Sequence, residues 1–98
     1  MARVEVSERA LADLERRFDF IAEEDPVRAR KQVLSVRRAL QLLAEHPLMG
    51  REAEEGRREL VLSRGRHGYI AKYRWLAADD VVLILAVRHQ REAGYSED

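Results

Sequence analysis

The stretch VVLILAVRHQREAGY, residues 81–95, decides the fold. It begins with an uninterrupted apolar run from Val81 to Val87, which predicts a strand that is buried on both faces and lies centrally in a sheet. A polar cluster with a histidine, two arginines and a tyrosine follows at once. This cluster is either an active site or the polar edge of the sheet, and the rest of the chain bears on that choice.

The residues before this run predict two more strands. The segment from Tyr69 to Trp75 alternates, with Tyr69, Ala71, Tyr73 and Trp75 on one face and Ile70, Lys72 and Arg74 on the other. Leu60 and Leu62 alternate with Val61 and Ser63 in the same way. The sequence SRGRHG, residues 63–68, and the triplet at 78–80 are the expected turns. These features predict a three-stranded antiparallel meander.

The first half of the chain predicts a short strand and two helices. The strand covers Arg3 to Val6, and Ser7 follows it as the N-cap of a helix that extends to about Glu24. Asp25 and Pro26 start a second helix, which should end near Glu45 because Pro47 disfavours helical geometry at the residue before it. The two helices should form an antiparallel hairpin, and residues 46–56 should form a loop.

The predicted fold is therefore α+β, with a short N-terminal strand, an antiparallel helix hairpin and a three-stranded antiparallel meander in one twisted sheet. At 98 residues the chain is long enough for one domain, which we expect to cover residues 1–98. Two helices can cover only one face of the sheet. The other face must be covered by the C-terminal tail or by a partner.

Composition narrows the possible functions. The chain has no cysteine, so disulfides and thiolate metal sites are excluded, and His46 and His67 lack the spacing of zinc ligands. We expect neither a metal nor another cofactor. The N-terminus has no apolar leader, and Val81 to Val87 is too short to span a bilayer, so we expect a cytoplasmic protein with no membrane partner.

The formal net charge is zero, but the charges are unevenly distributed. Between Arg57 and Arg74 there are six cations and a single anion, Glu59. This basic strand region suits an anionic partner, either nucleic acid or an acidic peptide. The alternative is that the arginines only occupy solvent-facing strand positions.

Several short motifs, taken in order, resemble the RelE/ParE superfamily of small bacterial toxins over nearly the whole chain. They are Ser7…Ala10…Asp13-Leu14, Pro47-x-x-Gly50-Arg51, Arg58…Leu60, Gly68-Tyr69-Ile70 with Tyr73-Arg74, and Val87-Arg88-His89 with Arg91-Glu92 and Tyr95. The resemblance implies a toxin of a type II toxin-antitoxin system that is neutralised by a cognate antitoxin.

In this superfamily the antitoxin is usually an acidic, partly disordered segment attached to a DNA-binding domain, and the two proteins form a hetero-oligomer. Such a segment would cover the open sheet face and the basic strands. The antitoxin contacts that we expect are Arg57, Tyr69, Tyr73 and Trp75. The superfamily contains both ribosome-dependent mRNA endonucleases and ParE-type inhibitors of DNA gyrase, so the fold does not decide the target.

For a nuclease, the polar cluster supplies a possible proton-transfer and phosphate-binding set, namely His89, Arg91 and Tyr95. The residues expected to bind the target or a phosphate are Arg58, Arg64, Arg66, Arg74 and Arg88. However, the resemblance implies a phosphate-binding cation in nuclease members at the position that Ile70 occupies here. It also implies two lysines, in some of those members, near the positions of Val61 and Ser63. These departures favour the ParE-type, plasmid-stabilisation branch, which causes growth arrest without chemistry of its own. A ribosome-dependent nuclease and an inactive binding module remain the alternatives.

Overall fold

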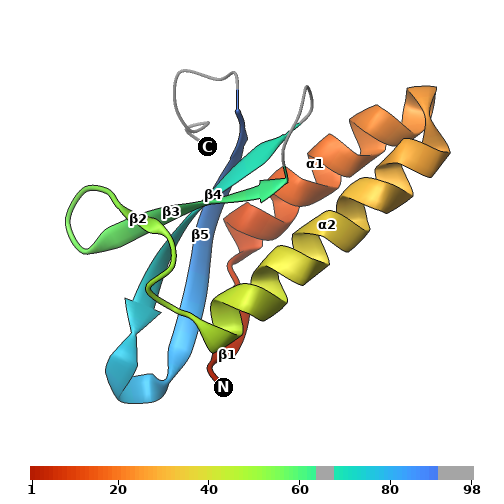
Figure 1. Ribbon diagram of the computed structural model, residues 1–98. Helices are drawn as coiled ribbons and strands as arrows, with labels where there is room; N and C mark the ends of the chain where they lie inside the picture. The colour runs from red at the N-terminus through yellow and green to blue at the C-terminus, as the bar shows by residue number, and fades with distance from the viewer. Residues whose placement is uncertain (64–67, 91–98) are drawn as a thin grey trace.

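The computed structural model describes residues 1–63 and 68–90, and it forms two layers (Figure 1). A helical hairpin packs on one face of a five-stranded sheet. The elements are β1 (Arg3–Val6), α1 (Glu8–Glu24), α2 (Pro26–Glu45), β2 (Arg51–Glu52), β3 (Arg57–Ser63), β4 (Tyr69–Leu76), the 3₁₀ helix η1 (Ala77–Asp79) and β5 (Val81–His89). The predicted α+β class is confirmed.

The helices begin and end where the capping residues predict. The Ser7 hydroxyl accepts a hydrogen bond from the Ala10 amide at 3.1 Å, and the Asp25 carboxylate accepts one from the Arg28 amide at 3.1 Å. Each cap satisfies an amide of the first turn that has no partner within its helix. Pro26 is the first residue of α2, where the missing amide costs nothing.

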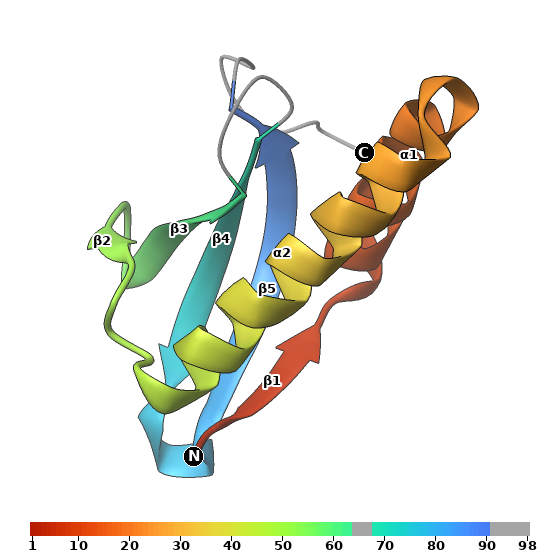
Figure 2. The same cartoon turned by 45° about the vertical axis from the view of Figure 1, so that its right-hand side comes forward.

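The sheet is mixed, with the strand order β1-β5-β4-β3-β2. β1 pairs in parallel with β5 and leads directly into α1 (Figure 2). The apolar strand β5 therefore lies inside the sheet, between β1 and β4, as predicted. The segment expected to be a loop at residues 46–56 contains a fifth strand, β2, which is too short to produce a periodic pattern.

A β-bulge explains why β5 is apolar without alternation. Lys72 of β4 pairs with Ala86, whereas Tyr73 pairs with Ile84, so Leu85 has no partner in β4. The extra residue reverses the alternation, and both Ile84 and Val87 consequently belong to the core. The continuous apolar run thus reflects a bulge as well as burial.

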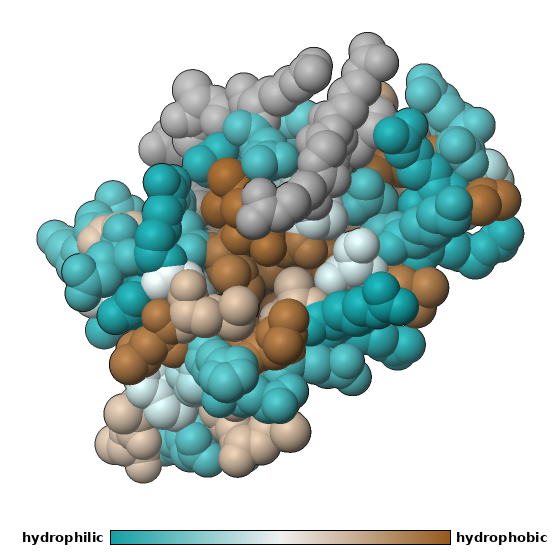
Figure 3. Space-filling view, in the orientation of Figure 1, coloured by the Kyte–Doolittle hydropathy of each residue, from teal (hydrophilic) through white to brown (hydrophobic). Residues whose placement is uncertain are grey.

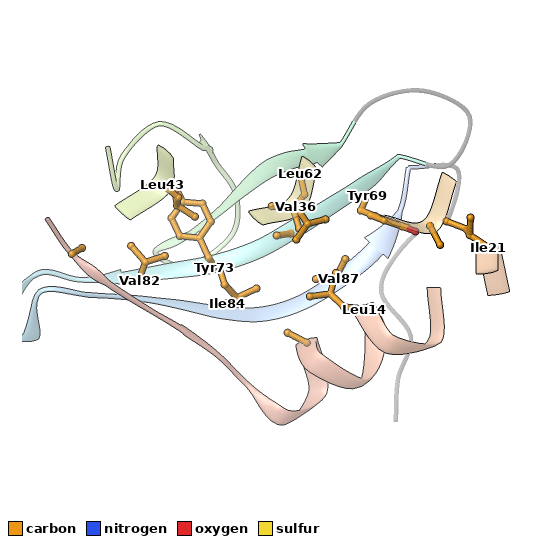
Figure 4. Close-up of a cluster of buried hydrophobic side chains, with 14 residues drawn as sticks. Leu14, Ile21, Val36, Leu43, Leu62, Tyr69, Tyr73, Val82, Ile84 and Val87 are labelled. Atoms are coloured by element: carbon orange, nitrogen blue, oxygen red, sulfur yellow. The ribbon is translucent and has the colours of Figure 1, made fainter. Parts of the chain in front are cut away.

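The core lies between the sheet and the two helices (Figure 4). Tyr69 and Tyr73 have no exposed surface and pack among apolar side chains of the helices and of β5. Neither ring has surface available for a partner, so the expectation that these two tyrosines contact an antitoxin is wrong. They alternate on the strand face that the helices cover, and helix packing buries them.

Tyr73 also anchors the Pro47–Arg51 segment. Its hydroxyl donates to the Pro47 carbonyl at 2.7 Å and accepts from the Gly50 amide at 2.9 Å. The Arg58 guanidinium donates to the Gly50 carbonyl at 2.8 Å and to the Leu48 carbonyl at 3.3 Å. Burial raises the pKa of Tyr73, which keeps its phenol protonated and able to donate.

The face of the sheet away from the helices is partly covered. Ile70, Val81 and Ala86 are buried on it, and Lys72 forms an ion pair with Glu54 at 3.0 Å. The C-terminal tail, which we expected as one possible cover, lies outside the described residues. Within residues 1–63 and 68–90, no helix is both long and apolar enough to cross a membrane.

Candidate functional site

The polar cluster begins at the C-terminal end of β5. Arg88 and His89 lie opposite Ile70 and Tyr69 of β4. Both polar side chains are half-buried, and the Arg88 guanidinium donates to the His89 carbonyl at 3.3 Å. The end of β5 therefore presents one permanent cation and one imidazole beside the start of β4.

Side chains of α1 and its cap hold this end of β5 where β1 no longer pairs with it. The Ser7 hydroxyl donates to the carbonyl of the bulged Leu85 at 3.0 Å. One carboxylate oxygen of the buried Asp13 accepts from the Val87 amide at 2.9 Å, and the other accepts from Arg16 at 2.8 Å. β1 pairs with β5 only as far as Ile84, so the Leu85 carbonyl and the Val87 amide have no partner in β1. The bonds to Ser7 and Asp13 satisfy these two backbone groups, which would cost free energy if they were buried without a partner.

Asp13 is a residue whose role the sequence could have revealed. It lies between Ala10 and Leu14 on the buried face of α1, where a carboxylate needs a partner. An acidic residue within that apolar stripe indicates a buried carboxylate with a structural role. The partner, an amide in β5, could not be inferred, because it lies 74 residues away in the chain.

Tyr69 lies beneath this end of the sheet, with its ring edge-on to Phe18 at a centroid distance of 6.0 Å. Its hydroxyl is buried and has no hydrogen-bond partner in the part of the chain that the structure describes. Burial raises the pKa of Tyr69 to about 12, although the nearby positive charge of Arg17 opposes the shift. Tyr69 is therefore a neutral core residue throughout the physiological pH range.

This pKa predicts a loss of stability in alkaline solution. Between pH 10 and 12 the unfolded chain loses the phenolic proton while the folded protein keeps it, so the free energy of unfolding falls as the pH rises. A two-unit shift corresponds to a loss of about 2.7 kcal/mol. Urea denaturation at several pH values should show this fall in the wild type and a smaller one in Tyr69→Phe. The smaller fall that remains in Tyr69→Phe comes in part from Tyr73, because burial raises the pKa of that phenol too. An equal fall in both proteins would show that Tyr69 is not the cause of the alkaline instability.

The predicted catalytic set is only partly described. His89 lies at the end of β5, whereas Arg91 and Tyr95, together with Arg64 and Arg66, lie outside the described residues. The three uncharged residues at the expected cation positions are Val61, Ser63 and Ile70; Ser63 and Ile70 are buried, and Val61 is half-buried. Ile70 lies directly opposite Arg88 in the sheet.

The described members of the predicted target- or phosphate-binding set, Arg58, Arg74 and Arg88, lie at two separate places on the sheet. Arg58 and Arg74 lie near the other end of the meander, about 16 Å from Tyr69 along β4. Arg58 is engaged by loop carbonyls and lies 3.6 Å from Glu52. Arg58 and Arg74 are therefore separate from Arg88 on the sheet, and the binding of a target or a phosphate by these residues stays a prediction.

The basic strand region is also partly neutralised. Three glutamates of β2 and the β2–β3 loop pair with cations of the strands: Glu55 with Arg57, Glu52 with Arg58, and Glu54 with Lys72. Sequence reasoning counted only the strands and missed these acids. Within the described residues, no three His, Asp or Glu side chains are grouped so that they could hold a metal ion.

A helical hairpin on one face of a mixed five-stranded sheet is the α+β arrangement that the resemblance to the RelE/ParE superfamily of toxins implies. Residues 4–94 match the family described as ParE toxin of the type II toxin-antitoxin system parDE, and the chain belongs to that family.

Two relatives support this assignment, and one solved structure has the same fold. The chain is 33% identical over 92 residues to Toxin RelE3 of Caulobacter vibrioides, covering 94% of this chain and 98% of that protein. It is 38% identical over 89 residues to Toxin RelE2 of the same organism, covering 91% and 96%. A chain in the crystal structure of the intact E. coli RelBE toxin-antitoxin complex matches with a TM-score of 0.65 at 17% identity, over 94% of this chain and 100% of that chain.

Proposed function

We propose that this type II toxin arrests growth as a protein ligand of DNA gyrase, in the manner of the ParE branch, and that a cognate antitoxin neutralises it. The observation that carries the proposal is that Val61, Ser63 and Ile70, at the positions where the resemblance implies cations in nucleases, are uncharged and buried or half-buried. The match to the ParE toxin family supports the same conclusion.

The energetic argument concerns phosphoryl chemistry. Each well-placed donor at such a centre contributes about 3–4 kcal/mol to the transition state, by analogy with oxyanion-hole donors. A site that lacks two or three of these cations would be slow. A ligand of gyrase needs no such centre, since it acts by binding alone.

The proposal of an antitoxin partner is supported by the exposed apolar surface of the protein and by the complex in which a chain of the same fold occurs. Apolar surface gathers between the sheet and α2 in the view of Figure 3, and the exposed apolar side chains of the protein include Val33, Leu48 and Met49. A partner segment that buries such surface would stabilise the complex. The E. coli chain with the same fold belongs to the intact RelBE toxin-antitoxin complex. We propose a cytoplasmic hetero-oligomer of toxin and antitoxin, encoded as a plasmid-stabilisation type of system.

A ribosome-dependent mRNA endonuclease is the second candidate. Two observations favour it: both curated relatives are named RelE, and His89 and Arg88 stand together at the end of β5. An imidazole and a guanidinium are suitable groups for proton transfer and phosphate binding.

The test is to induce the protein without antitoxin and to follow thymidine and amino-acid incorporation during the first minutes. We expect DNA synthesis to fall first while translation continues. An early collapse of translation with cleaved messages would instead establish the nuclease. Absence of any growth arrest would leave an inactive binding module.

The variant His89→Ala provides a further prediction. At a binding interface fewer than about 30% of the residues cost more than about 1 kcal/mol when truncated, and those that do are enriched in Trp, Tyr and Arg, so this substitution of a histidine should weaken growth arrest only partly. Thermal melting and antitoxin binding of the variant serve as controls for folding. Complete loss of toxicity in a folded, antitoxin-binding variant would count strongly against the gyrase proposal.

A further inference from the structure

The N-terminal end of β3 contains a pocket that the proposed target site does not use. It has a volume of about 380 Å³ and lies between the β2–β3 loop and the end of β4. Its lining combines two cations, an indole and small and apolar groups with one carboxylate, that of Glu52, which pairs with Arg58 at 3.6 Å. The lining residues are Leu48, Glu52, Ala53, Gly56, Arg57, Arg58 and Trp75.

Arg57 is the residue in this pocket with an unmet bonding requirement. Its Nε is buried and has no hydrogen-bond partner within residues 1–63 and 68–90. Its ion pair with Glu55 is long, at 4.0 Å, and the Glu55 side chain is 86% exposed, so solvent screens it. Arg57 also lies directly opposite Arg74 across the β3–β4 pair, and two like charges in that arrangement repel each other. A carboxylate in the pocket would satisfy the Nε–H and reduce the repulsion.

The surroundings distinguish a single carboxylate from a nucleic acid. Glu52, Glu54 and Glu55 form an exposed acidic rim on the loop beside the pocket. A phosphate backbone would place several negative charges within about 8 Å of this rim, which is the range over which charges interact at physiological salt. One side-chain carboxylate can reach Arg57 with a smaller penalty, and apolar neighbours of that carboxylate can contact Trp75 and Leu48.

We infer that this pocket binds a glutamate or aspartate side chain flanked by apolar residues, and that the segment supplying it belongs to the antitoxin. The carboxylate accepts hydrogen bonds from the Arg57 guanidinium, and the apolar flank packs on the indole of Trp75. The identity of the partner rests on the proposed toxin function, whereas the chemistry of the pocket rests on Arg57 and Trp75 alone.

The first test uses Trp75 as the reporter, since it is the single tryptophan of the chain. The full-length protein is titrated with the blocked peptide acetyl-Ala-Leu-Glu-Leu-Ala-amide and with its glutamine counterpart, and Trp75 fluorescence is recorded. We expect a saturable change, with the glutamate peptide binding about tenfold more tightly or better. Arg57→Gln should abolish the difference, and Arg3→Gln, at the far edge of the sheet, should retain it. Equal binding of the two peptides would overturn the inference, as would an RNA hexamer that competes with the glutamate peptide.

The second test uses the toxin-antitoxin complex. The Kd of the cognate antitoxin is measured for the wild type and for Arg57→Gln, and the variant should bind about tenfold more weakly or worse. Unchanged affinity would overturn the assignment of the antitoxin as the partner while leaving the toxin function intact. If the wild type neither arrests growth nor binds an antitoxin, the proposed function fails, and the peptide titration still decides whether the pocket binds a carboxylate.

Discussion

Replacing Gly50 with alanine should lower the free energy of unfolding by about 3 kcal/mol. A Cβ at this position would lie 2.7 Å from the Glu59 carbonyl oxygen, and also 2.7 Å from both Cε1 and the hydroxyl oxygen of Tyr73. One of these neighbours is backbone and the other is a fully buried ring, so neither can move freely. The methyl group must displace the Tyr73 hydroxyl, which would also weaken its bonds to Gly50 and Pro47.

Gly56→Ala is the matched control for this experiment. Gly56 has a φ of +72°, but among the described residues no atom except those of its chain neighbours lies within 4 Å of a Cβ built there. Alanine should therefore cost only the left-handed backbone term of about 1 kcal/mol. In thermal melts, Gly50→Ala should lower Tm by at least about 12 °C, and Gly56→Ala should lower it much less. Similar losses in both variants would mean that steric contact at Gly50 is not the cause.

The Gly50 result also bears on what the sequence could predict. The Pro47-x-x-Gly50-Arg51 motif could be read as a helix stop followed by a turn, and the helix does end there. Its dependence on Tyr73 could not be read, because the tyrosine is 23 residues away and approaches through the fold. Helix boundaries depend on local capping groups such as Ser7 and Asp25, and for this reason they were predicted correctly.

Predictions that required knowledge of what lies across the sheet were less successful. The alternation of Tyr69 and Tyr73 showed that they share a face, but only helix packing shows that this face is the core. The bulge at Leu85 was hidden because every residue around it is apolar. The basic strands could be counted, whereas the pairing of Lys72 with Glu54 depends on how the loop folds back.

Replacing Asp13 with alanine should also cost about 3 kcal/mol, because the buried Val87 amide would lose its charged acceptor. The ion pair with Arg16 adds little, since the arginine side chain is half exposed. Urea denaturation should show the loss as a lower midpoint with an unchanged slope. Asp19→Ala is the matched control, since Asp19 is an exposed acid on the same helix and should change stability by less than about 0.5 kcal/mol.

Asp13→Asn separates the hydrogen bond from the charge. The amide oxygen of asparagine can still accept from Val87, so this variant should lose only about 1 kcal/mol. Because Val87 immediately precedes Arg88 and His89, Asp13 sets the position of the polar cluster as well as the stability of β5. Toxicity should therefore follow the hydrogen bond, with Asp13→Asn retaining growth arrest that Asp13→Ala loses at the temperature of the cell. Equal toxicity of the two variants at equal protein levels would show that the end of β5 keeps its position without this contact.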